Sequence, residues 1–122
     1  MGRSYKDLVA WQRAMDLVTA VYQATANFPK DELFGLTGQL RRAAVSVPSN
    51  IAEGQGRLHR KEFKHFLGTA RGSLMEVETQ LQIALNLRYL SNETCGELLH
   101  RCSEVGRILN GLLASVGKEP LL

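Results

Sequence analysis

Apolar side chains recur at alternating steps of three and four residues in four separate segments of this 122-residue chain. This spacing places them along one face of an α-helix, because a helix completes a turn in about 3.6 residues. We expect the four helices to cover residues 7–25, 33–54, 60–90 and 92–116. Short connections between amphipathic helices favour antiparallel neighbours. The pattern therefore predicts an all-α fold, an antiparallel up-and-down four-helix bundle with a long third helix, formed by a single domain over residues 1–122.

The first segment carries a continuous stripe of large apolar side chains on one helical face. We expect this face to point into the core, because an amphipathic helix buries its apolar side. The stripe consists of Leu8, Trp11, Met15, Val18 and Tyr22. Asp7, directly before it, is the expected N-cap or first-turn acid of the helix.

Pro48 lies inside the second segment. A proline in a helix interior removes one backbone hydrogen bond and costs about 3 kcal/mol unless it is compensated. The apolar repeat continues past it to Ile51, so we expect a helix that is kinked at Pro48 and does not end before it. Ser46 and Ser49 are candidates to satisfy the freed backbone groups.

The segment around Pro48 also carries polar side chains that are unusual in a bundle helix. Asn50 and Glu53 lie one turn apart and flank Ile51, so we expect them to be partly buried. A buried carboxylate needs a cation, which Arg41, Arg42 or Arg71 could supply. We expect a structural motif that locks the helix pairing, and the alternative is a ligand site. The motif consists of Ser46, Pro48, Ser49, Asn50, Glu53 and Gly54, with Ser73 and Glu76 from the third helix.

No combination of residues typical of a metal centre or an enzyme occurs in the sequence. The histidines and cysteines do not form a zinc-binding or di-iron spacing. The glycines at 54 and 56 lack the third glycine of a dinucleotide-binding loop and the lysine of a phosphate loop. We therefore expect no enzyme activity, no metal and no cofactor, and no small-molecule substrate is indicated.

The cysteines and the hydropathy pattern bear on where the protein resides. Cys95 and Cys102 lie two helical turns apart, too far for a disulfide between them, and we expect reduced core residues. The N-terminal segment does not resemble a signal peptide. No apolar stretch approaches the roughly 18 residues of a membrane span. The expected location is the cytoplasm, with no membrane partner.

Basic residues are concentrated in the middle of the chain. Residues 41–71 hold seven basic and two acidic side chains, a net charge of +5, and leave −2 for the rest of the +3 chain. Such a cluster can bind phosphates electrostatically. The alternative is a solvated helix start with ordinary surface charges. The candidate nucleic-acid-binding residues are Arg57, Arg60, Lys61 and Lys64, with Arg41 and Arg42 further along the second helix.

A few large apolar residues do not fit the inward stripes. Ile83, Leu85 and Leu87 lie off the stripe of the third helix, and Trp11 and Tyr22 are candidate aromatics at the rim of the first. Apolar surface that one bundle does not cover is typical of a protein interface. We take these five residues as a candidate oligomer interface.

Four stretches of the chain form one recognisable pattern: residues 7–12 (DLVAWQ), 35–46 (GLTGQLRRAAVS), 48–54 (PSNIAEG) and 72–81 (GSLMEVETQL). This pattern resembles the bacterial four-helix-bundle proteins encoded within intervening sequences of large-subunit ribosomal RNA genes. The similarity extends over nearly the whole chain, and its most specific part is the run from Ser46 to Gly54.

The resemblance implies an antiparallel four-helix bundle that assembles into a ring-like homopentamer. It also implies kinship with the basic accessory proteins of diversity-generating retroelements, which are similar bundles that bind nucleic acid and a reverse transcriptase. It implies no known enzyme activity. The resulting hypothesis is a non-enzymatic homo-oligomer that binds RNA or DNA, and the alternative is a protein-interaction scaffold that does not bind nucleic acid.

Overall fold

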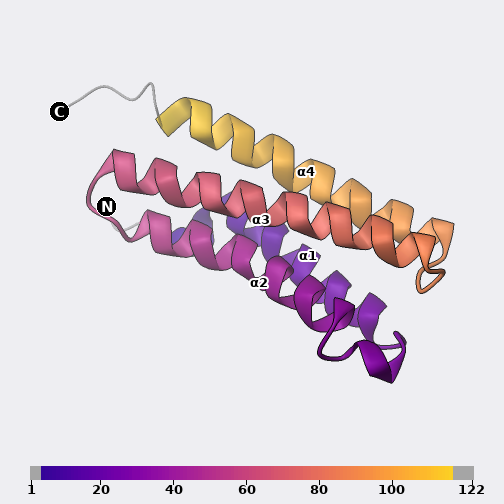
Figure 1. Ribbon diagram of the computed structural model, residues 1–122. Coiled ribbons are helices and arrows are strands. Elements are labelled where there is room, and N and C mark those ends of the chain that lie inside the picture. The colour runs from indigo at the N-terminus through magenta and orange to yellow at the C-terminus, as the bar shows by residue number, and fades with distance from the viewer. Residues whose placement is uncertain (1–3, 117–122) are drawn as a thin grey trace.

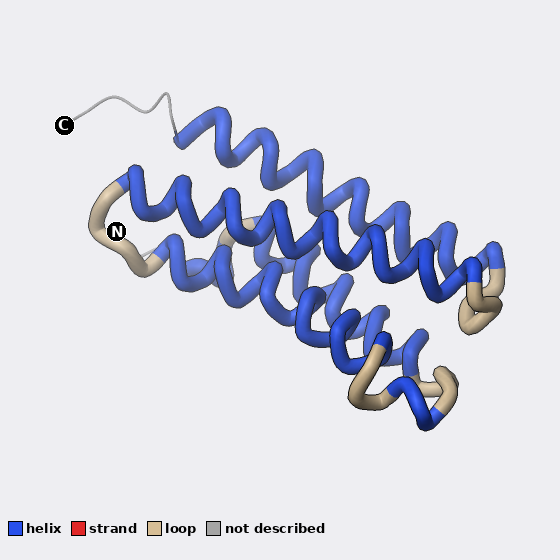
Figure 2. The backbone as a smooth tube through the Cα atoms, viewed as in Figure 1, coloured by secondary structure: helices blue, strands red, loops and turns tan. Residues whose placement is uncertain are grey.

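Four α-helices account for most of residues 4–116, the part of the chain that the computed structural model describes (Figure 1). Two short 3₁₀ helices and short connections make up nearly all of the remainder (Figure 2), and no strand occurs in this part of the chain. In chain order the helices are η1 (Tyr5–Asp7), α1 (Val9–Thr25), η2 (Lys30–Glu32), α2 (Leu36–Gln55), α3 (Arg60–Asn86) and α4 (Asn92–Val116).

The helices form a closed antiparallel square in which neighbours in sequence are neighbours in space. α2 packs against α1 and α3, and α4 packs against α3 and α1, whereas the backbones of the diagonal pairs α1–α3 and α2–α4 do not come close to each other. The α2–α3 turn lies at one end of the square, and the α1–α2 and α3–α4 connections lie at the other (Figure 1). This arrangement confirms the predicted up-and-down four-helix bundle.

α2 runs unbroken through Pro48, as the continuing apolar repeat predicts. Asn50 Nδ2 donates to the backbone oxygen of Ser46 at 2.8 Å and contacts its Oγ at 2.9 Å. Ser46 Oγ also bonds Ser73 Oγ of α3 at 2.9 Å. The Ser46 hydroxyl therefore links two helices and does not satisfy the backbone groups freed by the proline, while Ser49 is exposed to solvent.

Local capping sets the helix boundaries that differ from the predicted ranges. Asp7 belongs to η1, where its carboxylate accepts from the backbone N–H of Ser4 at 3.1 Å, so α1 begins only at Val9. α3 ends at Asn86, and Arg88 follows it with a left-handed φ of 64°. Such a residue just past the last turn is a common helix terminator. The N-terminal turn of α4 is capped by Ser91 Oγ, which accepts from Thr94 N–H at 3.1 Å.

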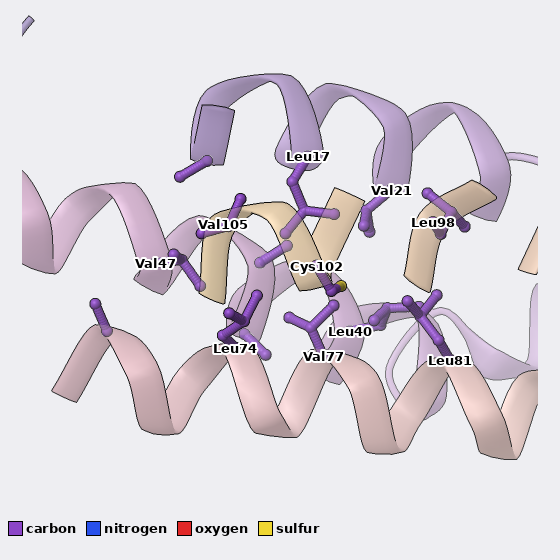
Figure 3. Packing of buried hydrophobic residues seen from close by; sticks show 14 of the residues in the cluster. Leu17, Val21, Leu40, Val47, Leu74, Val77, Leu81, Leu98, Cys102 and Val105 are labelled. Atoms are coloured by element: carbon purple, nitrogen blue, oxygen red, sulfur yellow. The ribbon is translucent and has the colours of Figure 1, made fainter. Parts of the chain in front are cut away.

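The core consists of aliphatic side chains from all four helices, which point toward one another between the ribbons (Figure 3). Fully burying one such side chain stabilises a protein by about 2 kcal/mol. The labelled members are Leu17 and Val21 of α1, Leu40 and Val47 of α2, Leu74, Val77 and Leu81 of α3, and Leu98, Cys102 and Val105 of α4.

The face of α1 that packs on the core is not the predicted one. The buried positions are Ala10, Ala14, Leu17, Val21 and Thr25. The predicted stripe lies beside them and is only half-buried at its start, while Met15 and Tyr22 are 40% and 43% exposed. The physical reason is size: the alanines let α1 approach the bundle closely, and the larger side chains remain at the outer edge of the helix.

Both cysteines are free and buried, in agreement with the expected core role. Cys95 Sγ donates to the backbone oxygen of Leu81 at 3.7 Å. Burial raises the pKa of the Cys102 thiol to about 12.

Within the described residues, none of the helices has the length and hydropathy needed to cross a membrane.

Candidate nucleic-acid interface

The turn between α2 and α3 brings four of the predicted basic residues together. α2 ends at Gln55 and α3 begins at Arg60, so the side chains follow one another around a tight reversal of the chain. We call this group the basic corner; it consists of Arg57, Arg60, Lys61 and Lys64. Lys61 and Lys64 are exposed, and Arg60 is half-buried.

The basic corner is fixed in place by close packing of α2 against α3. A Cβ atom on Gly54 would lie 2.8 Å from Phe66 Cβ and 3.0 Å from Phe63 Cδ1, so only glycine allows this approach. The turn is closed by a hydrogen bond from Arg57 N–H to the Gly54 oxygen at 3.1 Å. Extended backbone at His59 then starts α3. The basic side chains therefore project from a constrained turn.

Arg57 is held by two side-chain contacts. Its Nη2 lies 2.8 Å from Glu53 Oε2, and its guanidinium stacks over the Phe66 ring at 4.8 Å. Glu53 is exposed, so the expectation of a partly buried carboxylate that pairs with Arg41, Arg42 or Arg71 is wrong. The glutamate sits in the last turn of α2, where it faces the turn and not the helix interface.

The charge of the corner is positive but modest. Two acidic side chains, Glu53 and Glu62, accompany its four basic ones, which leaves a net charge of +2 over residues 53–64. The sequence interpretation missed a further feature of the turn, the side chain of Leu58, which is 94% exposed between Arg57 and His59. A loop residue outside every apolar repeat gives no periodic signal, and only its position beside the charges could have identified it.

Arg41 and Arg42 do not belong to the basic corner. They lie in the second turn of α2, which is roughly 20 Å from its far end at about 1.5 Å per residue. Arg41 Nε donates to Thr25 Oγ1 at 2.9 Å, and its guanidinium lies over the Tyr22 ring at 4.6 Å. Arg42 is exposed on the α2–α3 side. The structure thus divides the six predicted residues between the two ends of the bundle.

A polar groove of about 250 Å³ runs between α2 and α3. Its lining includes Ser46 and Ser73, which are hydrogen-bonded to each other, and the charged residues Arg42 and Glu76. Gln80 Oε1 is buried there without a hydrogen-bond partner. Three residues of the predicted polar motif therefore meet in this groove, whereas Ser49 and Glu53 lie outside it.

The candidate interface residues fall on two sides of the bundle. Trp11 lines an apolar groove of about 300 Å³ between α1 and α2, which we call the α1–α2 groove; its other lining residues are Tyr5, Met15, Val18, Val45, Pro48, Ser49 and Ala52. Ile83 lines a second groove of about 320 Å³ on α3, which we call the α3 groove, together with Gln39, Gly72, Met75, Glu76, Thr79 and Gln80.

The other three candidate residues lie outside these grooves. Tyr22 is exposed on the outer side of α1, where Arg41 covers its ring. Leu85 is partly buried and packs against the core. Leu87 is 49% exposed and caps the C-terminus of α3.

No cluster of three or more histidine, cysteine or acidic side chains suited to a metal ion occurs among residues 4–116.

Comparison with known proteins gives one family and one fold. The family model described as "23S rRNA-intervening sequence protein" matches residues 6–111. The chain is also similar to a crystal structure of a protein of unknown function from the S23 ribosomal protein family of Bacteroides thetaiotaomicron. That pair shows 19% identity and a TM-score of 0.78, with 86% of this chain and 98% of that chain covered. No curated protein matches the chain. The structural similarity supports the four-helix bundle.

Proposed function

Because this chain belongs to the 23S rRNA-intervening sequence protein family, we propose that it is a non-enzymatic cytoplasmic homo-oligomer that binds RNA or DNA through the basic corner. The observation that supports this most is the convergence of four basic side chains on one constrained turn. Arginine and lysine contact phosphate oxygens without reading sequence, so binding of this kind is electrostatic and weakly selective.

Assembly would overcome the weakness of a single corner. A net charge of +2 in one subunit gives only a weak attraction for a polyanion, but copies arranged around a ring would engage one nucleic acid together. The α1–α2 groove and the α3 groove lie on adjacent sides of the bundle and have mostly apolar linings. Contact between two different faces of successive copies generates a ring when the rotation closes. This is compatible with the homopentamer that the resemblance implies.

A salt titration of nonspecific RNA and duplex DNA binding tests the nucleic-acid part. We expect the logarithm of the binding constant to fall linearly with the logarithm of salt concentration. The double variant Lys61→Ala/Lys64→Ala removes two exposed cations of the corner and should lower the slope by about 2 per subunit engaged, since each phosphate contact contributes about 0.9. Fluorescence anisotropy at several salt concentrations measures both quantities.

The matched control removes the same charge elsewhere. Arg42→Ala/Arg101→Ala also deletes two exposed cations, neither of them in the basic corner. If this control lowered the slope of the salt dependence as much as the corner variant does, binding through the basic corner would be refuted. Absence of binding by the unmodified protein at low salt would refute the nucleic-acid proposal altogether.

The second candidate function is a protein-interaction scaffold without nucleic-acid binding. The observation in its favour is the α1–α2 groove, in which the Trp11 ring packs edge-on against Tyr5 with a centroid distance of 5.3 Å. Aromatic side chains in apolar grooves are frequent anchors of protein interfaces. A protein that forms oligomers but binds no nucleic acid at low salt would fit this function.

A further inference from the structure

A further cavity lies at the opposite end of the bundle from the basic corner. It has a volume of about 370 Å³ and sits between the last turn of α1 and the first turns of α2. Phe28, Pro29 and Leu33 form apolar walls, and Lys30 and Arg41 contribute two cations. The proposed function assigns no role to this place, although Arg41 was among the residues first predicted to bind nucleic acid.

Arg41 is held in the cavity with part of its hydrogen-bonding capacity unused. Its Nε donates to Thr25 Oγ1, and the guanidinium plane is stacked on Tyr22, so the side chain has one fixed orientation. The two terminal nitrogens make no hydrogen bond to the described residues. A guanidinium oriented in this way presents donors that match a planar carboxylate.

Thr37 supplies a second, independent indication of a ligand. The residue is only 4% exposed, it lines the cavity, and its Oγ1 is buried without a hydrogen-bond partner. A buried hydroxyl without a partner is unfavourable, and such groups are rare unless a ligand or water satisfies them. Thr37 also lies in the first turn of α2, where the helix dipole favours a negative charge.

The acidic neighbours limit the charge that the cavity can accept. Glu32 already uses both oxygens: Oε1 accepts from Leu36 N–H at 3.0 Å and Oε2 from the Tyr89 hydroxyl at 2.9 Å. Together with Asp31 it places negative charge close to the start of α2. Asp31 and Glu32 offset the charges of Lys30 and Arg41, so the surroundings are close to neutral and charge alone would hold an anion only weakly.

We propose that this cavity binds a small monocarboxylate with a short apolar body. The carboxylate would accept hydrogen bonds from the terminal nitrogens of Arg41, with Lys30 adding charge, and a rotation of the Thr37 side chain would bring its buried hydroxyl to the same carboxylate. The apolar body would lie against Phe28, Pro29 and Leu33. The basic corner plays no part in this site, so the proposal stands or fails independently of nucleic-acid binding.

Titration of the ¹⁵N-labelled full chain with sodium hexanoate, followed by heteronuclear NMR, tests the proposal. We expect saturable shifts of the amides of residues 25–41 at millimolar hexanoate. Arg41→Lys keeps the charge but loses the planar fork and should weaken hexanoate binding roughly tenfold, the size expected for one charge-assisted hydrogen bond. Thr37→Val, which is similar in shape, should weaken it severalfold.

Two probes and one variant serve as controls. Hexanol has the apolar body without the charge, and inorganic phosphate has the charge without the body; both should bind more weakly than hexanoate. Arg42→Lys changes the neighbouring arginine outside the cavity and should leave hexanoate affinity unchanged. The proposal would be overturned by the absence of saturable shifts in this region, by equal binding of phosphate or hexanol, or by unaltered affinity in Arg41→Lys.

Discussion

At the scale of single residues, Gly54 shows how one missing side chain determines the shape of the α2–α3 turn. The backbone of α2 approaches Phe66 and Phe63 so closely that a methyl group would overlap them. The position is therefore important for packing, although its backbone conformation is an ordinary helical one. The geometry of the basic corner depends on this contact.

We expect Gly54→Ala to lower the free energy of unfolding by about 1–3 kcal/mol, because the added methyl group forces α2 and α3 apart. Gly68→Ala, at an exposed position of α3 outside the grooves, is the matched control, since a Cβ there meets nothing within 4 Å. Alanine has the higher helix propensity, so the control should raise stability by up to about 1 kcal/mol. Urea denaturation measures both, and equal effects of the two substitutions would contradict the overlap.

The second residue-scale prediction concerns Cys102, whose pKa is raised to about 12 by burial from an ordinary value of 9.0. The unfolded chain releases this proton near pH 9, whereas the native state retains it until near pH 12. The native state therefore binds more protons in this interval, and stability falls as the pH rises through it. The contribution is complete below pH 9.

Chemical denaturation at a series of pH values checks this behaviour. The two proteins differ only at this position, so the comparison of the native sequence with Cys102→Ala isolates the thiol. We expect the variant to be less stable at neutral pH because it leaves a cavity, but to lose less stability between pH 9 and 12. Parallel losses in the two proteins would show that the thiol does not contribute.

At the scale of helices, the sequence predicts which helices form and in what order better than it predicts which face of each helix packs on the core. The four apolar repeats were sufficient to place the helices within a few residues, and the repeat that continues past Pro48 correctly predicted that α2 does not end there. These signals are local, since they depend on the period of a helix and on the chemistry of its ends. The face of α1 that packs on the core depends on how closely α1 approaches its neighbouring helices. The apolar repeat of α1 alone does not contain this information.

The candidate site shows the same division between local and tertiary information. The convergence of Arg57, Arg60, Lys61 and Lys64 was predictable because they are adjacent in sequence around a turn. Arg41 and Arg42 were grouped with them by composition alone, although α2 carries them to the other end of the bundle. The cavity beside Arg41 could not be predicted either, because it needs the end of α1 and the start of α2 to meet.

At the scale of the whole molecule, the two apolar grooves are the surfaces on which assembly would depend. Met15 lines the α1–α2 groove and is 40% exposed, so a charged side chain there can be accommodated in the isolated bundle. In an interface it would be buried without a partner, which is strongly unfavourable. Substitution at this position therefore separates folding from assembly.

Light scattering coupled to size-exclusion chromatography provides the measurement. We expect the unmodified chain to elute as an oligomer and Met15→Glu as a 13.5 kDa monomer with unchanged helical content. Gln82→Glu adds the same charge at an exposed position of α3 outside both grooves and should leave the oligomer intact. A monomeric mass for the unmodified protein at micromolar concentration would refute the ring.

The closed square of helices also has a kinetic consequence. Three of its four sides join helices that are consecutive in the chain, and only the α1–α4 side brings distant segments together. Chains dominated by contacts of this local kind fold in microseconds to milliseconds. Each bundle should therefore finish folding long before it meets another copy. Diffusion and protein concentration, rather than chain folding, would then limit the rate at which a ring forms in the cell.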